Sequence, residues 1–566
     1  MRGRHSQANG TYAGKGLTAS SPGPTLRPHM TATSPEPWPA GTEGPADGTG
    51  AAGAITAPRG AGPRLLGLEP YAIVFLASAV TLILEILAAR ILAPHIGVSV
   101  YTWTSIIGVI LAGISIGNWV GGMLADRWGS RTMLGLIFMA GAAATALVPA
   151  LANWLPNIIS PLPILFRIVL LTLLLFFLPS FILATVSPIV IKLTLRSLEK
   201  TGEVAGRIYA VSTAGAILGT FLTGFVLVQT FGSRATVYGL AIILVLLGLV
   251  AGRLWRSPRT LLTGLALIMA AGIAASFSNP LKSLCLRESN YFCIRVLDKQ
   301  VEGYQVKELV LDQLVHSYIK VGDPTHLEYG YQKLFAETVA AYASARPDFR
   351  ALFIGGGGYE MPRYLEEVYP QSVIEVMEID PAVTAAAHDF LDFRPDTRVV
   401  SFNEDARMRL PEQPKGQYDI VVGDAFNDVS VPWHLTTTEF AAQVKSLLRE
   451  DGIYAMNIVD APKQGRFLRA IVRTLQDNWP HVYVMNQSGD LDFDQRSTTV
   501  VMASDRELDE VSIRIGAVRK LDVTPITRIV PQSDMQKWLD AQPPTVLRDD
   551  FAPVDNYLAP LYLKSR

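Results

Sequence analysis

The chain has 566 residues, of which 49% are hydrophobic and 17% charged, and its formal net charge is −1. This length exceeds what one hydrophobic core ordinarily serves, and the apolar content is too high for a purely soluble protein. The near-neutral charge argues against nucleic acid as the main partner, because nucleic-acid binding needs a strongly basic surface.

Residues 1–65 are dominated by Gly, Ala, Pro, Ser and Thr and show no apolar periodicity. Such a segment cannot bury enough surface to offset the entropy of ordering, so we expect a disordered tail. It lacks a charged start followed by one short apolar run and a small-residue cleavage site, which argues against a cleaved signal peptide.

Residues 70–277 are expected to form a multi-pass α-helical membrane domain of about seven helices. Apolar stretches of about 20 residues recur there, and each is long enough to cross roughly 30 Å of hydrocarbon. Prolines in the fourth stretch predict a kink or break. The predicted spans are 71–93, 101–124, 132–152, 164–190, 208–229, 235–252 and 260–277.

Positive charge in the connecting segments predicts the orientation, because Lys and Arg are retained on the cytoplasmic side. The segments after the first, third and fifth spans offer only Arg167 and Arg234, near their edges. Those after the second, fourth and sixth hold Arg127, Arg131, Lys192, Arg196, Lys200, Arg207, Arg253, Arg256 and Arg259. This predicts a cell-membrane protein with a cytoplasmic N-terminus. Seven spans then place the C-terminal domain outside, whereas six or eight place it inside.

Two features of this half leave alternatives open. Glu85 and Arg90 in the first span favour either a polar contact between helices or a path for a substrate or proton. The stretch "GGMLADRWGSR", residues 121–131, resembles a cytoplasmic loop of major facilitator transporters. Because only half a transporter's helices are present, a transport role would require a homodimer.

The only two cysteines, Cys285 and Cys293, lie eight residues apart just after the last span. In an oxidising compartment they would close a small loop, and the alternative is two unrelated buried thiols. A metal site is not expected, because the segment lacks further ligands. The histidines of this half also lack ligand spacing, and each is expected to be a surface or core residue: His316, His326, His388 and His434.

After a β-rich lead-in over 281–333, residues 334–566 alternate strands and helices, which predicts a Rossmann-like α/β domain with a parallel sheet covered on both faces. We expect helices around 361–369, 382–391, 437–449 and 464–478. The predicted strands are "ALFIGG", "SVIEVMEI", "TRVVSF", "YDIVVGD", "IYAMNIV", "HVYVMN" and "TTVVMAS", the last two forming an antiparallel pair. Five parallel strands followed by such a pair is the layout of nucleoside-dependent transferases.

Glycines follow the first predicted strand, where ligands of such sheets bind beyond the carboxyl ends of the strands. Gly355, Gly356 and Gly357 permit positive φ and close approach of a ligand to the backbone. About 20 residues further on, Glu378 is positioned to accept both ribose hydroxyls, with Asp380 as the alternative.

Acidic residues also end the next two strands. Asp405 could accept an adenine amino hydrogen, and Asp424 lies in the predicted crevice. Three successive strands thus each end in an acid, which is hard to explain if these side chains are merely solvated at the surface. The pattern predicts a site for a nucleoside-type ligand at these strand ends.

Several motifs resemble the spermidine synthase family of aminopropyltransferases, and the whole chain resembles members fused to a membrane helical bundle. They are "ESNYFCIRV", "LVLDQLVHSY", "LEYGYQKLF", "GGGGYE" and "GDAFND". The resemblance implies transfer of an aminopropyl group from decarboxylated S-adenosylmethionine to putrescine or another polyamine. It implies no tightly bound cofactor. Asp424 would be the catalytic base, and Tyr331 and Gln332 would line the substrate site.

The chain departs from the family pattern at the positions that would bind the amine substrate. Gly358 stands where the family has an Asp, and Asn427 where its second motif acid is expected. Glu360 and Asp428 are the substrate-binding acids that could take over, and Phe292 replaces an expected Gln. Two alternatives therefore stay open: a non-catalytic polyamine- or nucleoside-binding domain that senses or gates through the bundle, and a methyltransferase.

Overall fold

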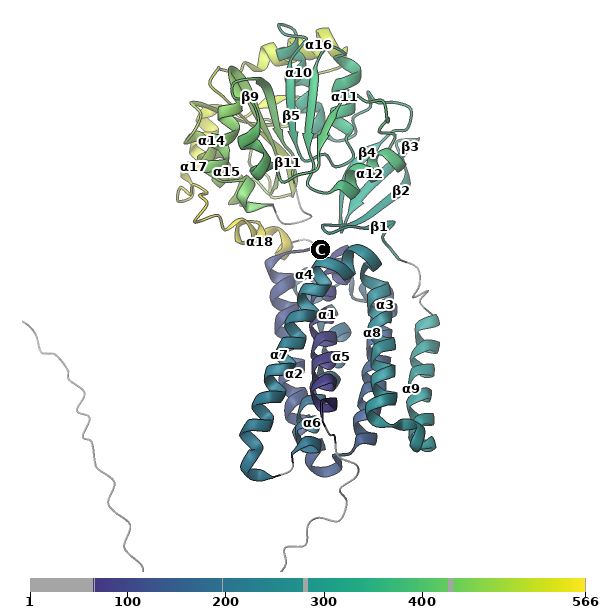
Figure 1. Ribbon diagram of the computed structural model, residues 1–566. Helices are drawn as coiled ribbons and strands as arrows, with labels where there is room; N and C mark the ends of the chain where they lie inside the picture. The colour runs from purple at the N-terminus through teal and green to yellow at the C-terminus, as the bar shows by residue number, and fades with distance from the viewer. Residues whose placement is uncertain (1–64, 66, 196, 278–282, 426–430, 565–566) are drawn as a thin grey trace, which may run out of the picture. The chain divides into compact units, whose positions relative to one another are not determined.

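The computed structural model describes residues 65, 67–195, 197–277, 283–425 and 431–564 (Figure 1). Of the tail expected over 1–65, only Leu65 falls among these residues. The described chain comprises an apolar helical region, a small antiparallel sheet and a larger mixed sheet flanked by helices.

Within the described residues, six helices are long and apolar enough to cross a membrane by length and composition. The fourth combines α4, a π-helical turn, α5 and α6, and the fifth combines α7, a second π-helical turn and α8. Their bounds are Glu69–Ile96 (α1), Val100–Trp128 (α2), Arg131–Ile159 (α3), Ile164–Thr194 (α4–α6), Thr201–Gly252 (α7–α8) and Pro258–Ser276 (α9).

The fifth helix contains both stretches predicted as separate spans, 208–229 and 235–252. It is 52 residues long, which corresponds to about 78 Å at 1.5 Å per residue and is more than twice a hydrocarbon core. At Gly232 the backbone leaves the helical conformation, with φ 72° and ψ 169°. Two crossings joined at this bend match the thickness of a bilayer, whereas one straight crossing does not.

Residues that follow the helical region form a four-stranded antiparallel sheet in the order β1-β2-β3-β4. A helix, α10 (Gly330–Ala343), continues the chain into the larger domain. The strands are β1 (Arg287–Glu288), β2 (Cys293–Val301), β3 (Tyr304–Leu311) and β4 (Leu314–Ile319).

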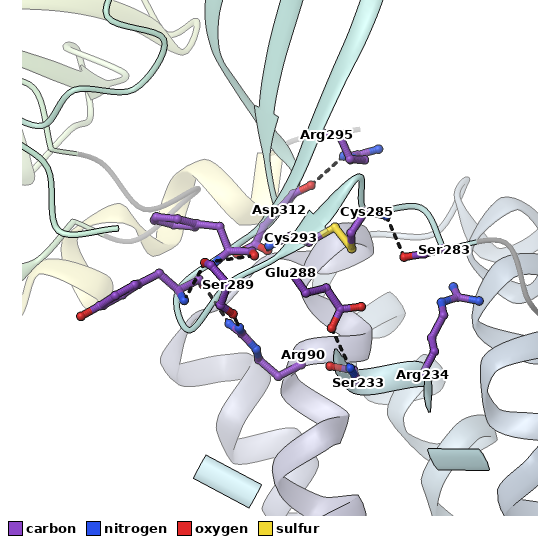
Figure 2. The surroundings of a disulfide bond; sticks show 12 residues. Arg90, Ser233, Arg234, Ser283, Cys285, Glu288, Ser289, Cys293, Arg295 and Asp312 are labelled. Carbon is purple, nitrogen blue, oxygen red and sulfur yellow. Dashed lines mark hydrogen bonds between the residues drawn. A yellow bond between two sulfur atoms is a disulfide. The ribbon is translucent and has the colours of Figure 1, made fainter. Parts of the chain in front are cut away.

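Cys285 and Cys293 form a disulfide, which settles the two alternatives in favour of a closed loop (Figure 2). Inside this loop, Ser289 Oγ accepts hydrogen bonds from the backbone N–H groups of Tyr291 and Phe292, over 3.0 and 2.9 Å. Arg90 of α1 donates to the backbone carbonyls of Ser289 and Tyr291. Its guanidinium therefore makes a structural polar contact.

The larger sheet has eight strands in the order β12-β10-β11-β9-β8-β5-β6-β7. Strands β5 to β9 are parallel, and β10, β11 and β12 pair antiparallel. The bounds are β5 (Arg350–Ile354), β6 (Val373–Met377), β7 (Val400–Phe402), β8 (Tyr418–Gly423), β9 (Leu448–Asp460), β10 (His481–Asn486), β11 (Ser497–Ser504) and β12 (Arg528–Ile529). This confirms the predicted Rossmann-like fold class.

Helices cover both faces of this sheet. Leu352 and Ile354 of β5 pack with residues of α14 and α15, whereas Ala351 and Phe353 pack with residues of α10 to α12. Further helices are α11 (Glu360–Val368), α12 (Pro381–Phe390), α13 (Ala406–Arg409), α14 (Thr438–Leu447), α15 (Phe467–Gln476), α16 (Glu510–Leu521), α17 (Gln532–Asp540) and α18 (Val554–Lys564). Because β5 lies between β6 and β8, the chain order reverses at its carboxyl end, which is where such sheets bind ligands.

Candidate active site

The turn between β5 and α11 has a left-handed backbone at Gly355 (φ 98°), Gly357 (φ 49°) and Tyr359 (φ 56°). A Cβ on Gly355 would lie 2.5 Å from the backbone oxygen of Asp424. Glycine is thus required there for two reasons, positive φ and close approach of the end of β8.

Glu378, at the end of β6, faces this turn. Its Oε2 accepts hydrogen bonds from the N–H groups of Gly356 and Gly357 over 2.8 and 3.2 Å, and its Oε1 accepts one from Asp380 over 3.0 Å. Burial raises the pKa of Glu378, and these backbone hydrogen bonds oppose the rise. The carboxylate retains acceptor capacity for a ligand.

Asp380, the alternative to Glu378 as the acceptor of the ribose hydroxyls, has a structural role. Its Oδ1 accepts a hydrogen bond from Ala382 N over 2.9 Å and caps α12, and its Oδ2 accepts one from Ser289 Oγ. It is only 1% exposed. These contacts favour Glu378 as the acid available to a ligand.

A cavity of about 280 Å³, here called the Glu378 cavity, lies at the ends of β5, β6 and β8. Asp405 lines it, accepts a hydrogen bond from Arg407 N over 2.8 Å and lies 3.4 Å from His434 Nε2. Apolar and aromatic walls complete it, and they include Tyr291, Phe292, Leu311, Met377 and Leu435. It therefore combines four acids, Glu378, Glu404, Asp405 and Asp424, with surfaces on which a flat ring could stack.

Asp424 is half-buried directly after β8. Its Oδ2 accepts a hydrogen bond from Tyr331 Oη over 3.0 Å, and its Oδ1 accepts one from Asn457 Nδ2 over 2.9 Å. Burial raises the pKa of Asp424, and the two hydrogen bonds partly offset this. The pKa of Tyr331 is also well above its usual value because of burial, so its hydroxyl stays a donor.

A second cavity, of about 240 Å³, is here called the Glu360 cavity. Glu360 opens α11 and is 3% exposed, and Gln332 Nε2 donates to its Oε2 over 3.1 Å. Burial raises the pKa of Glu360 to about 7. The wall of this cavity combines acids, amides, aromatic rings and one guanidinium: Tyr329, Tyr331, Gln332, Glu360, Asp424, Asn457 and Arg496.

The two cavities share four lining residues: His316, Gly355, Gly357 and Asp424. Each residue expected at the site that lies within the described chain therefore lines one of these two cavities, and Asp424 lines both. Glu360, one of the two acids expected to take over from the missing Asp, lines the Glu360 cavity. Asn427 and Asp428 lie outside the described residues, so their expected roles stay predictions.

The structure accounts for the glycine at position 358. Gly358 N donates to Ser317 Oγ over 3.0 Å, and a Cβ on Gly358 would lie 2.6 Å from Ser317 Cβ. The turn is packed against β4 at this point and leaves no room for a carboxylate side chain.

Sequence reasoning missed several residues that line the site, among them His434 of the Glu378 cavity, which was also not expected there. His316, expected to be a surface or core residue, borders both cavities, and burial lowers its pKa to about 4. Asn457 interrupts the apolar run of β9, and that interruption was a usable signal. Arg496 is exposed at the edge of the Glu360 cavity, and its sequence context carried no signal.

No protein-family model matches the chain. The polyamine aminopropyltransferase of Vibrio vulnificus is 34% identical over 142 residues, which are 25% of this chain and 48% of that protein. The N-terminal histidine N-methyltransferase of Emericella nidulans is 31% identical over 180 residues, 29% of this chain and 31% of that protein. A crystal structure of a probable spermidine synthase from Corynebacterium glutamicum aligns with a TM-score of 0.42 and 22% identity, over 48% of this chain and 99% of that one. The chain thus spans less than half the length of either curated relative and is similar to aminopropyltransferases at the level of one domain.

Proposed function

We propose that the C-terminal domain transfers an aminopropyl group from decarboxylated S-adenosylmethionine to a polyamine, releasing methylthioadenosine. The observation that carries this proposal is the position of Asp424 where the Glu378 and Glu360 cavities meet. A base at that junction can reach an amine held in one cavity and a sulfonium nucleoside held in the other.

The reaction is an in-line displacement. The amine nitrogen forms a bond to the carbon beside the sulfonium, the carbon–sulfur bond breaks, and its electron pair neutralises the sulfur. The ammonium proton passes to the carboxylate of Asp424, which Tyr331 and Asn457 hold in place. Glu378 and Asp405 would bind the nucleoside, and Gln332 and Glu360 would bind the acceptor.

The test uses the purified full-length protein with decarboxylated S-adenosylmethionine and a panel of di- and polyamines, and measures methylthioadenosine. Asp424→Asn should lower the rate by about 100-fold or more, because it removes the base but keeps the shape. Asp396→Asn, an exposed acid outside both cavities, is the matched control. No methylthioadenosine with any amine would refute the proposal.

A methyltransferase would use the same nucleoside cavity but release S-adenosylhomocysteine. The similarity to the histidine N-methyltransferase supports this alternative. Incubation with S-adenosylmethionine and analysis of the nucleoside product separates the two reactions.

The helices from α1 to α9 are proposed to anchor the protein in a lipid bilayer, with the N-terminus in the cytoplasm. If Gly232 joins two crossings, seven spans place the C-terminal domain on the outer side, where a disulfide persists. Reporter fusions at the C-terminus test this orientation directly.

An outer location favours a second candidate function, because a cytosolic sulfonium donor would not ordinarily reach the site. The domain would then bind a polyamine or nucleoside and signal through the bundle without turnover. Ligand binding that persists in Asp424→Asn while function is lost would argue for catalysis and against this second candidate.

A further inference from the structure

A third cavity, of about 400 Å³, lies beside α15 and shares no lining residue with the Glu378 or Glu360 cavity. We call it the arginine cavity, because Arg466, Arg469 and Arg473 line it. Their spacing of three and four residues places them on the same face of α15 and its N-terminal end. No acidic residue of the described chain is among its lining residues.

Arg469 holds the wall of the cavity together. It donates hydrogen bonds to the backbone carbonyls of Trp538 and Gly465, over 3.1 and 2.6 Å, and its guanidinium lies 4.2 Å from the centre of the Trp538 ring. The buried Asp460 lies near enough to favour the charged form of Arg469 electrostatically. Its position is thus fixed by the fold, and it lines the cavity.

The other two arginines keep unused donor capacity. Arg473 Nη2 donates to Asp540 Oδ1 over 2.7 Å, while Arg473 Nε is buried and has no hydrogen-bond partner in the described chain. Asp540 is 59% exposed and lies outside the cavity wall. Arg466 is exposed and forms no ion pair within the described residues. Arg473 Nη1 makes one long hydrogen bond, to Gln476 Oε1 over 3.4 Å, so this arginine and the exposed Arg466 keep donors for a bound acceptor.

Neutral polar side chains line the same space. Gln542 and Thr545 come from the segment after α17, and Tyr557 comes from α18. Guanidinium, amide and hydroxyl groups together match the several acceptor oxygens of a phosphate group. Because α18 also contacts the apolar helix α4, a lipid headgroup is one source of that phosphate, and a free phosphate compound is the other.

We propose that the arginine cavity binds a phosphate-type oxyanion through Arg466 and Arg473. This site is separate from the proposed aminopropyl transfer and does not depend on it.

The experiment measures binding to the purified full-length protein in two arms, one with inorganic phosphate and one with vesicles of phosphatidylglycerol or phosphatidylcholine. Arg466→Gln should weaken binding about five- to tenfold, since it removes one charge-assisted contact from a partly exposed site. Arg506→Gln, another exposed arginine, is the matched control and should bind like the wild type.

Asp540→Asn should strengthen binding, whereas Arg466→Gln should weaken it. Asp540→Asn releases Arg473 from its ion pair while keeping the arginine, so binding should tighten about two- to fivefold. One supporting outcome is saturable binding of inorganic phosphate that is tightest in Asp540→Asn, weaker in the wild type and weakest in Arg466→Gln. It supports a free phosphate compound as the ligand. Binding confined to phosphatidylglycerol vesicles, with the same order, supports a lipid headgroup. The proposal is overturned if neither probe binds, or if Arg466→Gln and Arg506→Gln bind equally well.

Discussion

The hydroxyl of Tyr331 donates a hydrogen bond to Asp424 Oδ2 over 3.0 Å, at the point where the Glu378 and Glu360 cavities meet. Tyr331 lies in the first turn of α10, far from Asp424 in the sequence, and the fold brings the two together. The contact matters for the proposed base, because a hydrogen bond to a carboxylate favours its ionised form.

Tyr331→Phe should therefore raise the pKa of Asp424 further above its usual value. A base works only when ionised, so the acidic limb of the pH–rate profile should move to higher pH. The rate at pH 7 should fall by about tenfold or more, in line with the loss of a hydrogen bond to a charged group. Steady-state formation of methylthioadenosine between pH 5 and 9 is the measurement.

Tyr364→Phe is the matched control for that experiment, because Tyr364 is buried on α11 but lines neither cavity. Its profile should overlay that of the wild type. An acidic limb that stays in place in Tyr331→Phe would show that Tyr331 does not tune Asp424.

Much of the fold was predictable because buried parallel strands are continuous apolar runs. The segment "YDIVVGD" predicts a strand that the structure places at Tyr418–Gly423, with all six residues buried. The short β12 and the helices α10, α13, α16, α17 and α18 were not predicted. The sequence of α16 has weak amphipathic character, and a two-residue strand is too short to leave a pattern.

The site was predictable where residues follow strand ends and unpredictable where it depends on contacts across the fold. Glu378, Asp405 and Asp424 were selected because each ends a strand. The structure supports the preference for Glu378 over Asp380 through a contact that the sequence does not show, the hydrogen bond between Asp380 and Ser289. The contact between Gly358 and Ser317 likewise joins residues 41 positions apart.

Glu360 should make the protein's stability fall as the pH rises. Its pKa is about 7 in the folded state against 4.5 for the free side chain, so the folded protein holds the proton more tightly. Stability is therefore fully present below pH 4.5 and is lost as the pH rises towards 7, by an amount on the order of 3 kcal/mol. Glu360→Gln should flatten this part of the profile. Thermal melts of both proteins from pH 4 to 8 check it, and parallel slopes would contradict the assignment.

Reduction of the Cys285–Cys293 disulfide should weaken binding in the Glu378 cavity. The bond closes the loop that carries Tyr291 and Phe292, both of which line that cavity. Its loss should also lower the stability of this region by about 2–3 kcal/mol, because the loop is short. Binding of methylthioadenosine with and without a reductant is the measurement.

The double variant Cys285→Ser/Cys293→Ser provides the control for reduction. These are the only cysteines in the chain, so a reductant should have no effect on the variant. If the reductant weakens binding in the variant as well, the disulfide is not the cause.

Arg496 should oppose the binding of a dication in the Glu360 cavity. Its guanidinium is exposed at the cavity edge, where a second ammonium group would meet a like charge. Arg496→Gln should lower the KM for diamines about two- to fivefold, since exposed charges interact weakly. Arg506→Gln should leave it unchanged. A KM that rises in Arg496→Gln would mean that Arg496 helps to bind the acceptor, which would then carry an anionic group.

Gly358→Asp should destabilise the protein rather than add a useful acid. The new Cβ would lie 2.6 Å from Ser317 Cβ, and both residues are buried in the contact between the turn and β4. Overpacking of this kind costs about 1–3 kcal/mol, so the melting temperature should drop. Adding Ser317→Gly removes the clashing side chain and should recover part of the loss. If Gly358→Asp alone melts at the wild-type temperature and binds amines more tightly, the turn has the freedom to accept the side chain, and close packing against Ser317 does not explain why glycine occupies this position.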